Sequence, residues 1–256
     1  MKKKIVFVLG GSGLIGNAVI ELLLKQNKFD LINLDIKKRK KLNFIYTHEN
    51  FYKFDCNSDN LDLKISRIIK KFGVPDIFIN CSYPKTNDWE KNSFKEIKYK
   101  SLNNNIKSHL SSTCYIAKLM ADANVKIKKK CSIVLVSSIY GLVGQDLSIY
   151  KNTSIKENMT YSIMKGGILS FTKQMASYYS RKGIRINNVC PGGVIDKSKI
   201  KSKKYATFVK NYSSRCPIGR LAEPKEIAAS IVFLSSEDSS YITGTSLVID
   251  GGWTAI

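Results

Sequence analysis

Lys4-Ile-Val-Phe-Val-Leu-Gly-Gly-Ser-Gly-Leu-Ile-Gly16 opens the chain with a short apolar run, a glycine-rich turn and the start of a second apolar segment. The run over 4–9 predicts a β-strand, and the pattern after the turn predicts a helix over 14–27. The turn fits Gly-x-Gly-x-x-Gly through Gly11, Gly13 and Gly16. Backbone N–H groups at the start of such a helix attract a pyrophosphate, so this stretch predicts a dinucleotide-binding fold. A purely structural glycine turn is the alternative.

The rest of the chain repeats this alternation of strand and helix. Short β-rich apolar runs lie near 31–35, 51–54, 76–80, 132–137, 185–190 and 246–249. Longer helical patterns lie near 60–72, 94–122, 160–182, 205–212 and 224–236. This order predicts an α/β fold of Rossmann type, a doubly wound parallel seven-stranded sheet with helices on both faces. Because no repeat or linker divides the chain, we expect residues 1–256 to form a single domain.

The composition is that of a soluble globular protein, with 43% apolar and 24% charged residues. No apolar run approaches the ~18 residues that span a bilayer. The first apolar run is short and ends in a glycine turn, so we interpret it as a strand and not as a signal peptide. The six cysteines form no Cys-x-x-Cys pair and have no neighbouring His. We therefore expect a cytoplasmic protein with reduced thiols, no metal site and no membrane contact.

The chain is strongly basic, with a formal net charge of +22. Lysine clusters lie at 37–41, 126–130 and 197–204. An RNA- or DNA-binding protein is one hypothesis, and it predicts binding that collapses with added salt. The clusters are scattered and are not interleaved with aromatic residues, so we expect no nucleic-acid partner. A basic surface instead favours anionic small molecules, such as phosphorylated or nucleotide-linked substrates.

Asp35 ends the second predicted strand, 19 residues beyond Gly16. At this distance an acid can accept hydrogen bonds from the adenosine ribose of a dinucleotide. A carboxylate there repels a 2′-phosphate, which favours NAD. The run Lys37-Lys38-Arg39 could pair with such a phosphate, so NADP stays open as the cofactor. A plain turn acid is the alternative for Asp35.

Tyr161 and Lys165 share one face of the predicted helix over 160–182, because they lie four residues apart. The ammonium of Lys165 can therefore favour the ionised phenol. We expect it to bring the phenol pKa from about 10 toward working pH, as general acid–base chemistry requires. A solvated helix face gives the same spacing.

With these motifs in place, the chain resembles the compact single-domain branch of the short-chain dehydrogenase/reductase family over essentially its whole length. Asn80 is similar to the first residue of the family's Asn-Asn-Ala-Gly. Ser137-Ser138-Ile139-Tyr140-Gly141 resembles the Ser-Ser-x-x-Gly that holds the catalytic serine, which would be Ser138. The segment 185–192 resembles the Arg-Val-Asn-x-x-x-Pro-Gly beside the nicotinamide, and Tyr241-Ile-Thr-Gly244 and Asp250-Gly-Gly252 match the terminal strand.

The resemblance implies an NAD(P)-dependent oxidoreductase that transfers a hydride between the nicotinamide and a secondary alcohol or ketone. Tyr161 would exchange a proton with the substrate, Lys165 would hold ribose hydroxyls, and Ser138 would hydrogen-bond the substrate oxygen. Homo-oligomers, dimers or tetramers, are also implied. The cofactor site would comprise Gly10, Gly11, Ser12, Gly13, Leu14, Ile15, Gly16, Asp35, Asp55, Cys56, Asn80, Cys81, Tyr161, Lys165, Pro191, Gly192 and Val194. Asp55 would touch adenine, with a turn aspartate as the alternative.

The family's fourth catalytic residue is an asparagine, and here His109 takes its position by spacing. Asn105, one helical turn earlier, is the alternative. An imidazole could anchor the same proton relay and could itself titrate, whereas a locally packed histidine would have no such role. Other departures are Leu9, Cys81-Ser82-Tyr83-Pro84 and Asp196. Tyr83-Pro84 would narrow the site near the nicotinamide or form a rigid turn.

The interval from Ser138 to Tyr161 is longer than is usual in the family, so 141–159 contains an insertion, which we expect over the active-site mouth. Its groups, in Gln145-Asp146 and Tyr150-Lys151-Asn152, could bind a polar substrate or could belong to a passive loop. A second long loop is expected over 192–204. The unusual segments together resemble a bacterial subgroup for flagellin modification and surface-sugar biosynthesis, which implies a sugar or nucleotide-sugar substrate. The alternative function is a catalytically silent dinucleotide-binding sensor or scaffold.

Overall fold

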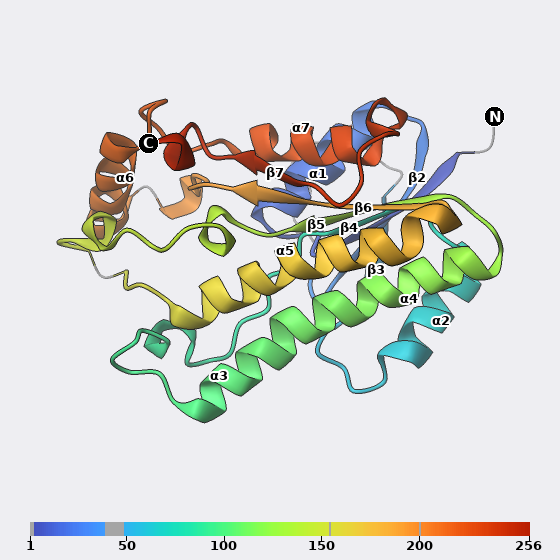
Figure 1. Ribbon diagram of the computed structural model, residues 1–256, viewed down its shortest axis with the longest axis horizontal. Helices are drawn as coiled ribbons and strands as arrows, with labels where there is room; N and C mark the ends of the chain where they lie inside the picture. The colour runs from blue at the N-terminus through green and yellow to red at the C-terminus, as the bar shows by residue number, and fades with distance from the viewer. Residues whose placement is uncertain (1–2, 39–48, 154, 200) are drawn as a thin grey trace.

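A parallel β-sheet forms the centre of the protein, as Figure 1 shows. The computed structural model describes residues 3–38, 49–153, 155–199 and 201–256. Its seven strands lie in the order β3-β2-β1-β4-β5-β6-β7, and every neighbouring pair is parallel. They are β1 (Lys4–Leu9), β2 (Phe29–Asp35), β3 (Glu49–Lys53), β4 (Ile77–Asn80), β5 (Cys131–Val136), β6 (Ile184–Pro191) and β7 (Ser246–Ile249). The Rossmann-type fold predicted from the sequence is confirmed.

Helices cover both faces of this sheet. They are α1 (Leu14–Lys25), α2 (Leu61–Phe72), α3 (Tyr99–Asn105), α4 (Ser112–Lys126), α5 (Met159–Tyr179), α6 (Lys203–Arg215) and α7 (Pro224–Ser235). In Figure 1, α1 and α7 lie on one face and α2, α4 and α5 on the other, and each group packs into its own apolar cluster with the strands. Strands buried on both faces are apolar almost throughout. No helix in the described ranges combines the length and apolarity needed to cross a bilayer.

Of the predicted helices, the one over 94–122 differs most from the structure in its bounds. Residues 94–98 are not helical, because the carbonyl of Ser93 accepts the N–H groups of Glu96 and Ile97 in a turn. The helix begins at Tyr99 and continues to Lys126, with a π-helical segment, Ile106–Ser111, between α3 and α4. Such wide turns are rare and often occur at functional sites. His109 lies in this one.

The order of the strands positions the site. From β1 the chain passes to β2 on one side, and β4 pairs with β1 on the other side. The connections that follow the neighbouring strands β1 and β4 leave their carboxyl ends toward opposite sides of the sheet, which opens a crevice there in folds of this type. The candidate site must therefore lie where β1, β2 and β4 end.

Candidate functional site

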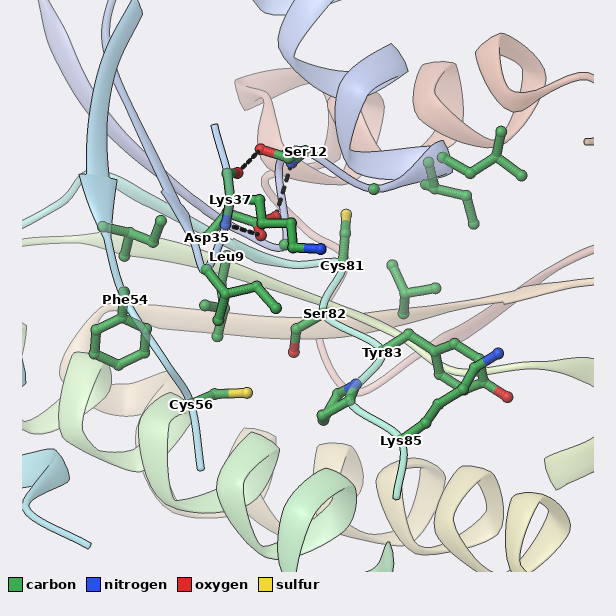
Figure 2. A pocket seen from close by; sticks show the side chains of 18 of the residues that line it. Leu9, Ser12, Asp35, Lys37, Phe54, Cys56, Cys81, Ser82, Tyr83 and Lys85 are labelled. Atoms are coloured by element: carbon green, nitrogen blue, oxygen red, sulfur yellow. Dashed lines mark hydrogen bonds between the residues drawn. The ribbon is translucent and has the colours of Figure 1, made fainter. Parts of the chain in front are cut away.

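A cavity of about 840 Å³ opens at the carboxyl ends of the strands (Figure 2). It is lined by most of the residues predicted to bind a cofactor: Gly10, Ser12, Gly13, Leu14, Ile15, Asp35, Asp55, Cys56, Cys81, Tyr161, Lys165, Pro191, Gly192 and Val194. Sequence reasoning missed other lining residues, among them Phe54, Asn57, Val136 and Lys85. All four lie at the end of a strand or within a few residues after it, and this position is the signal that could have found them.

The glycine turn joins β1 to α1 at one wall of this cavity. Gly10 has a φ of +77°, and its carbonyl accepts the N–H of Gly13 at 3.1 Å. A Cβ on Gly16 would lie 2.2 Å from that carbonyl oxygen, so only glycine allows α1 to start against the turn. Gly16 and Gly11 are not among the lining residues. They shape the turn from behind.

Asp35 ends β2 with its carboxylate at the cavity wall. Its two oxygens accept the backbone N–H groups of Ser12, at 2.9 Å, and Lys37, at 3.2 Å. The Ser12 hydroxyl donates to the Lys37 carbonyl at 2.6 Å, so these two linked residues fix the acid in place, as Figure 2 shows. A fixed carboxylate can accept hydrogen bonds from vicinal hydroxyls and repels a phosphate. Of the run Lys37-Lys38-Arg39, predicted as a possible phosphate partner, Arg39 lies outside the described residues.

Asn80 and Cys81 differ in what they do at the end of β4. Cys81 lines the cavity, whereas the buried Asn80 is not among the lining residues. The Asn80 side-chain oxygen accepts from the N–H of Ser82 at 2.9 Å and from its hydroxyl at 2.6 Å. A Cβ on Gly10 would lie 2.5 Å from the Ser82 nitrogen, so Asn80 holds a turn directly beneath the glycine loop.

Tyr161 lies in the first turn of α5 and lines the same cavity. The side chain of Asn158 accepts the Tyr161 N–H at 2.9 Å and so caps the helix. Burial raises the pKa of the Tyr161 phenol, and hydrogen bonding by the Ser138 hydroxyl opposes this. Ser138 is the second residue after β5 and is itself buried. The structure therefore brings the predicted serine and tyrosine together.

Lys165 lies one turn further along α5, but its ammonium does not bind the phenol. The Nζ atom donates to the Val136 carbonyl at 2.9 Å and lies 3.2 Å from Nε2 of His109. It is 5.5 Å from the centre of the Tyr161 ring. Burial lowers the pKa of Lys165 to about 7. The expectation that Lys165 brings the phenol pKa toward working pH is therefore wrong for the protein alone, in which desolvation dominates both groups.

The structure brings His109, and not Asn105, to Lys165. His109 is 1% exposed, and burial lowers its pKa well below the ordinary value, with the Lys165 ammonium lowering it further. A neutral imidazole can accept from the ammonium at Nε2. The amide of Asn105 instead donates to Thr86 Oγ1 at 2.8 Å and to the Ser101 carbonyl at 3.0 Å. Asn105 thus ties the β4–α3 connection to α3.

Aromatic rings surround the Tyr161 phenol. The ring of Tyr83 meets those of Tyr161, His109 and Trp89 edge-on, with centroids 5.8, 5.4 and 5.5 Å apart. Such edge-to-face pairs are favourable and fix ring orientation. Of the two roles considered for Tyr83-Pro84, the narrowing of the site agrees with this packing, since both residues line the cavity.

The insertion over 141–159 is anchored to the protein by its own polar groups. Gln145 donates to the Asn158 carbonyl at 2.8 Å and to the Ser162 hydroxyl at 3.0 Å, and its oxygen accepts from the Tyr150 hydroxyl at 3.0 Å. Asp146 pairs with Arg215 of α6 at 2.8 Å. The groups of Gln145, Asp146 and Tyr150 are therefore engaged within the protein. For these three residues the contacts favour the alternative of a passive loop over a substrate-binding role.

The cavity residues fit a nicotinamide dinucleotide. The Asp35 carboxylate suits one ribose and the buried Lys165 suits a second, and the start of α1, whose N–H groups suit a pyrophosphate, lines the same cavity. The Tyr161 phenol lines the cavity together with Lys165. This arrangement can bind two sugar–phosphate units and can exchange a proton with a third molecule beside them.

Comparison with known proteins finds similar chains along almost the whole sequence. A family model described as Enoyl-(Acyl carrier protein) reductase matches residues 15–254. The post-translational flagellin modification protein A of Campylobacter coli is 31% identical, over 99% of each chain. The 3-oxoacyl-[acyl-carrier-protein] reductase FabG of Buchnera aphidicola is 29% identical, over 98% of each chain.

Solved structures with bound cofactors are similar along the whole chain. A short-chain dehydrogenase from Leptospira borgpetersenii with bound NAD+ has a TM-score of 0.86 and 28% identity, covering 99% of this chain and 94% of that one. ElxO with NADP bound has a TM-score of 0.85 and 27% identity, covering 100% of both chains.

Proposed function

The chain belongs to the short-chain dehydrogenase/reductase family and is an NAD(P)-dependent oxidoreductase, and on this premise we propose that it interconverts a secondary alcohol and a ketone in a sugar-like compound. The observation that carries the proposal is the position of the Tyr161 phenol, which lines one cavity with the glycine turn and with Lys165. When bound, the nicotinamide supplies or accepts the hydride.

In this proposal Tyr161 is the proton donor and acceptor. Its burial raises the phenol pKa, so the group carries its proton at neutral pH and can donate it to a carbonyl oxygen during reduction. In the oxidative direction it accepts the proton of the alcohol. The Ser138 hydroxyl donates a hydrogen bond to the same substrate oxygen, which fixes the distance between that oxygen and the phenol.

Lys165 and His109 form the second part of the machinery. An ammonium has three N–H donors. One is directed to the Val136 carbonyl and one to Nε2 of His109, which leaves a third for a ribose hydroxyl. In this role His109 positions Lys165 by accepting one of its N–H groups at Nε2.

We further propose NAD as the preferred cofactor. The Asp35 carboxylate is fixed by two backbone N–H groups and would repel a 2′-phosphate, although Lys37 and Lys38 lie next to it. NADP therefore stays open as a weaker ligand.

The substrate class rests on the similarity to flagellin modification protein A together with the basic character of the chain. Both support a polar, sugar or nucleotide-sugar substrate, carbohydrate biosynthesis as the setting, and a cytoplasmic enzyme. Homo-oligomers, dimers or tetramers, are supported by exposed aromatic side chains on α3 and α4, Tyr99 at 80% and Tyr115 at 41% exposure.

Steady-state turnover of the purified protein tests this function. NADH, NAD+, NADPH and NADP+ would each be combined with a panel of nucleotide sugars, free sugars, keto sugars and simple ketones. We expect turnover of at least one sugar-like compound above the simple ketones, with higher kcat/KM for the NAD(H) pair. NADH binding without turnover of any member would contradict the proposal and favour the silent sensor or scaffold.

A further inference from the structure

Lys85 places an ammonium in the cavity wall on the side of the reacting phenol. It follows Tyr83-Pro84 in the connection between β4 and α3, and Figure 2 shows it beside Tyr83, away from Ser12 and Asp35. Its Nζ atom lies 4.7 Å from the centre of the Tyr83 ring and 5.8 Å from that of Trp89. Because the Tyr83 ring packs against Tyr161, two aromatic faces hold this cation close to the candidate catalytic group.

The charges around Lys85 are unbalanced. Within the described parts of the chain, no carboxylate forms an ion pair with Lys85, and Glu90 acts on it only at longer range. Lys199 is a second cation whose charge reaches Lys85, and burial and Lys199 together lower the pKa of Lys85. Lys199 itself pairs with Asp196 at 3.4 Å. The rim of the cavity near Tyr161 therefore carries an ammonium that an anion would stabilise.

We propose that Lys85 is a specificity-determining residue that binds an oxyanion of the substrate, a phosphoryl or carboxylate group at a distance from the reacting carbon. The inference rests on the proposed oxidoreductase function and narrows its substrate to an anionic polar compound. An ammonium with three donors on a flexible stem suits a phosphate or carboxylate as a point charge. The side chain is exposed enough to meet a ligand.

The cofactor pyrophosphate is the other anion in reach of this fold, but the geometry separates it from Lys85. The N–H groups that suit a pyrophosphate lie at the start of α1, near Gly13 and Leu14. Lys85 instead shares its aromatic contacts with the ring that packs on Tyr161. A purely structural clamp on Tyr83 would give the same contacts but would not depend on the charge of the substrate.

The experiment compares matched neutral and anionic substrates. The NADH- and NAD+-dependent turnover of hexoses would be measured against the corresponding hexose 6-phosphates, 1-phosphates and uronic acids. The variants are Lys85→Met, Lys85→Arg and, as a control in the same connection outside the cavity, Lys91→Met. We expect Lys85→Met to lower kcat/KM for the anionic members by about 10- to 100-fold, mainly through KM, with neutral members unchanged. Lys85→Arg should keep most of the activity, and Lys91→Met all of it.

Three results would overturn the inference. These are an equal effect on charged and neutral members, no effect on either, and a matching loss of NADH affinity in Lys85→Met, which would assign the residue to the cofactor. Preference between phosphates and uronic acids tells which oxyanion is bound.

A second readout keeps the inference separate from the proposed function. If the wild-type protein turns over no member of this panel or of the panel under Proposed function, the proposed function fails. Titration calorimetry of inorganic phosphate with the NADH-loaded protein then tests the oxyanion site at Lys85 by itself. We expect about tenfold weaker phosphate binding in Lys85→Met and unchanged binding in Lys91→Met. Equal affinities in the two variants would contradict an oxyanion site at Lys85.

Discussion

The ammonium of Lys165 lies 3.2 Å from Nε2 of His109, with both side chains buried. Burial lowers the pKa of each, and each charge would lower the pKa of the other. In the protonated pair the lysine therefore holds the proton, and the neutral imidazole accepts a hydrogen bond from it at Nε2. The contact is made by His109, which by spacing takes the position of the family's asparagine, and not by the alternative, Asn105.

Removing the imidazole should change how activity depends on pH. In His109→Leu the Lys165 ammonium keeps only the Val136 carbonyl, so we expect kcat to fall by about 10- to 100-fold and the pH–rate profile to move. His109→Asn should retain more activity, because an amide oxygen can still accept. Asn105→Leu is the matched control: it breaks hydrogen bonds to Thr86 and Ser101, so it should lower Tm without moving the profile. Superimposable profiles for wild type and His109→Leu would contradict the positioning role.

The stability of the cofactor-free protein should rise with pH because of Lys165. Its folded pKa is about 7 and its ordinary value is 10.5, so the unfolded chain binds more protons between these values. The free energy of unfolding then increases through this window by up to about 1.4 kcal/mol per pH unit. Buried thiols such as Cys81, with a pKa raised to about 12, act in the opposite direction. The measurement is therefore the free energy of unfolding in urea, taken for wild type and for Lys165→Met at pH 7 and at pH 9. The advantage of Lys165→Met over wild type should shrink from pH 7 to pH 9. The same difference at both pH values would refute this role of Lys165.

Much of the fold could be predicted from local sequence. The strand over 4–9 and the terminal strand over 246–249 have the predicted bounds, because short apolar runs next to glycine turns are unambiguous. The start of the helix at Tyr99 was not predictable in this way. It depends on a turn at Ser93 and on Asn92, whose side chain contacts Ser101 across the connection.

Site residues could be predicted from the sequence where a local pattern marks them. Asp35 stands at the end of a strand, and Tyr161 lies one helical turn before Lys165. Long-range partners gave no local signal. The pairing of Asp146 with Arg215 joins segments 69 residues apart, and no pattern around either residue indicates it. The same holds for Lys85: nothing in the local sequence distinguishes it from other lysines, and its contacts with the Tyr83 and Trp89 rings are seen only in the structure.

Cofactor preference should depend on Asp35. In Asp35→Asn the repulsion of a 2′-phosphate is lost and the acceptors for ribose hydroxyls are weakened, so we expect NADH affinity to fall about tenfold and NADPH affinity to rise. Asp55→Asn is the control, since Asp55 lines the cavity in the following strand connection and would affect both dinucleotides alike. Fluorescence titration with NADH and with NADPH gives the ratio of the two dissociation constants. An unchanged ratio in Asp35→Asn would contradict NAD selection by this residue.

A side chain at Gly16, in the first turn of α1, should destabilise the protein. In Gly16→Ala the new Cβ would lie 2.2 Å from the Gly10 carbonyl oxygen, so we expect a loss of about 1–3 kcal/mol in unfolding free energy and weaker NADH binding. Gly166→Ala in α5 is the matched helical control, because its Cβ would meet the Gly141 oxygen at an ordinary 3.7 Å. That variant should be unchanged or more stable by about 0.5–1 kcal/mol. Equal unfolding curves for both variants would contradict the close approach.

The Tyr161→Phe variant tests the central claim most directly, since it removes one hydroxyl from the cavity wall and leaves the ring packing against Tyr83 in place. With the substrate found in the panel, kcat would be measured beside NADH affinity, and Tyr178→Phe on the exposed side of α5 serves as the control. We predict a fall in kcat of about 10²- to 10⁴-fold with NADH binding and Tm unchanged. Wild-type turnover in Tyr161→Phe would contradict the assignment of the phenol as the proton-transferring group.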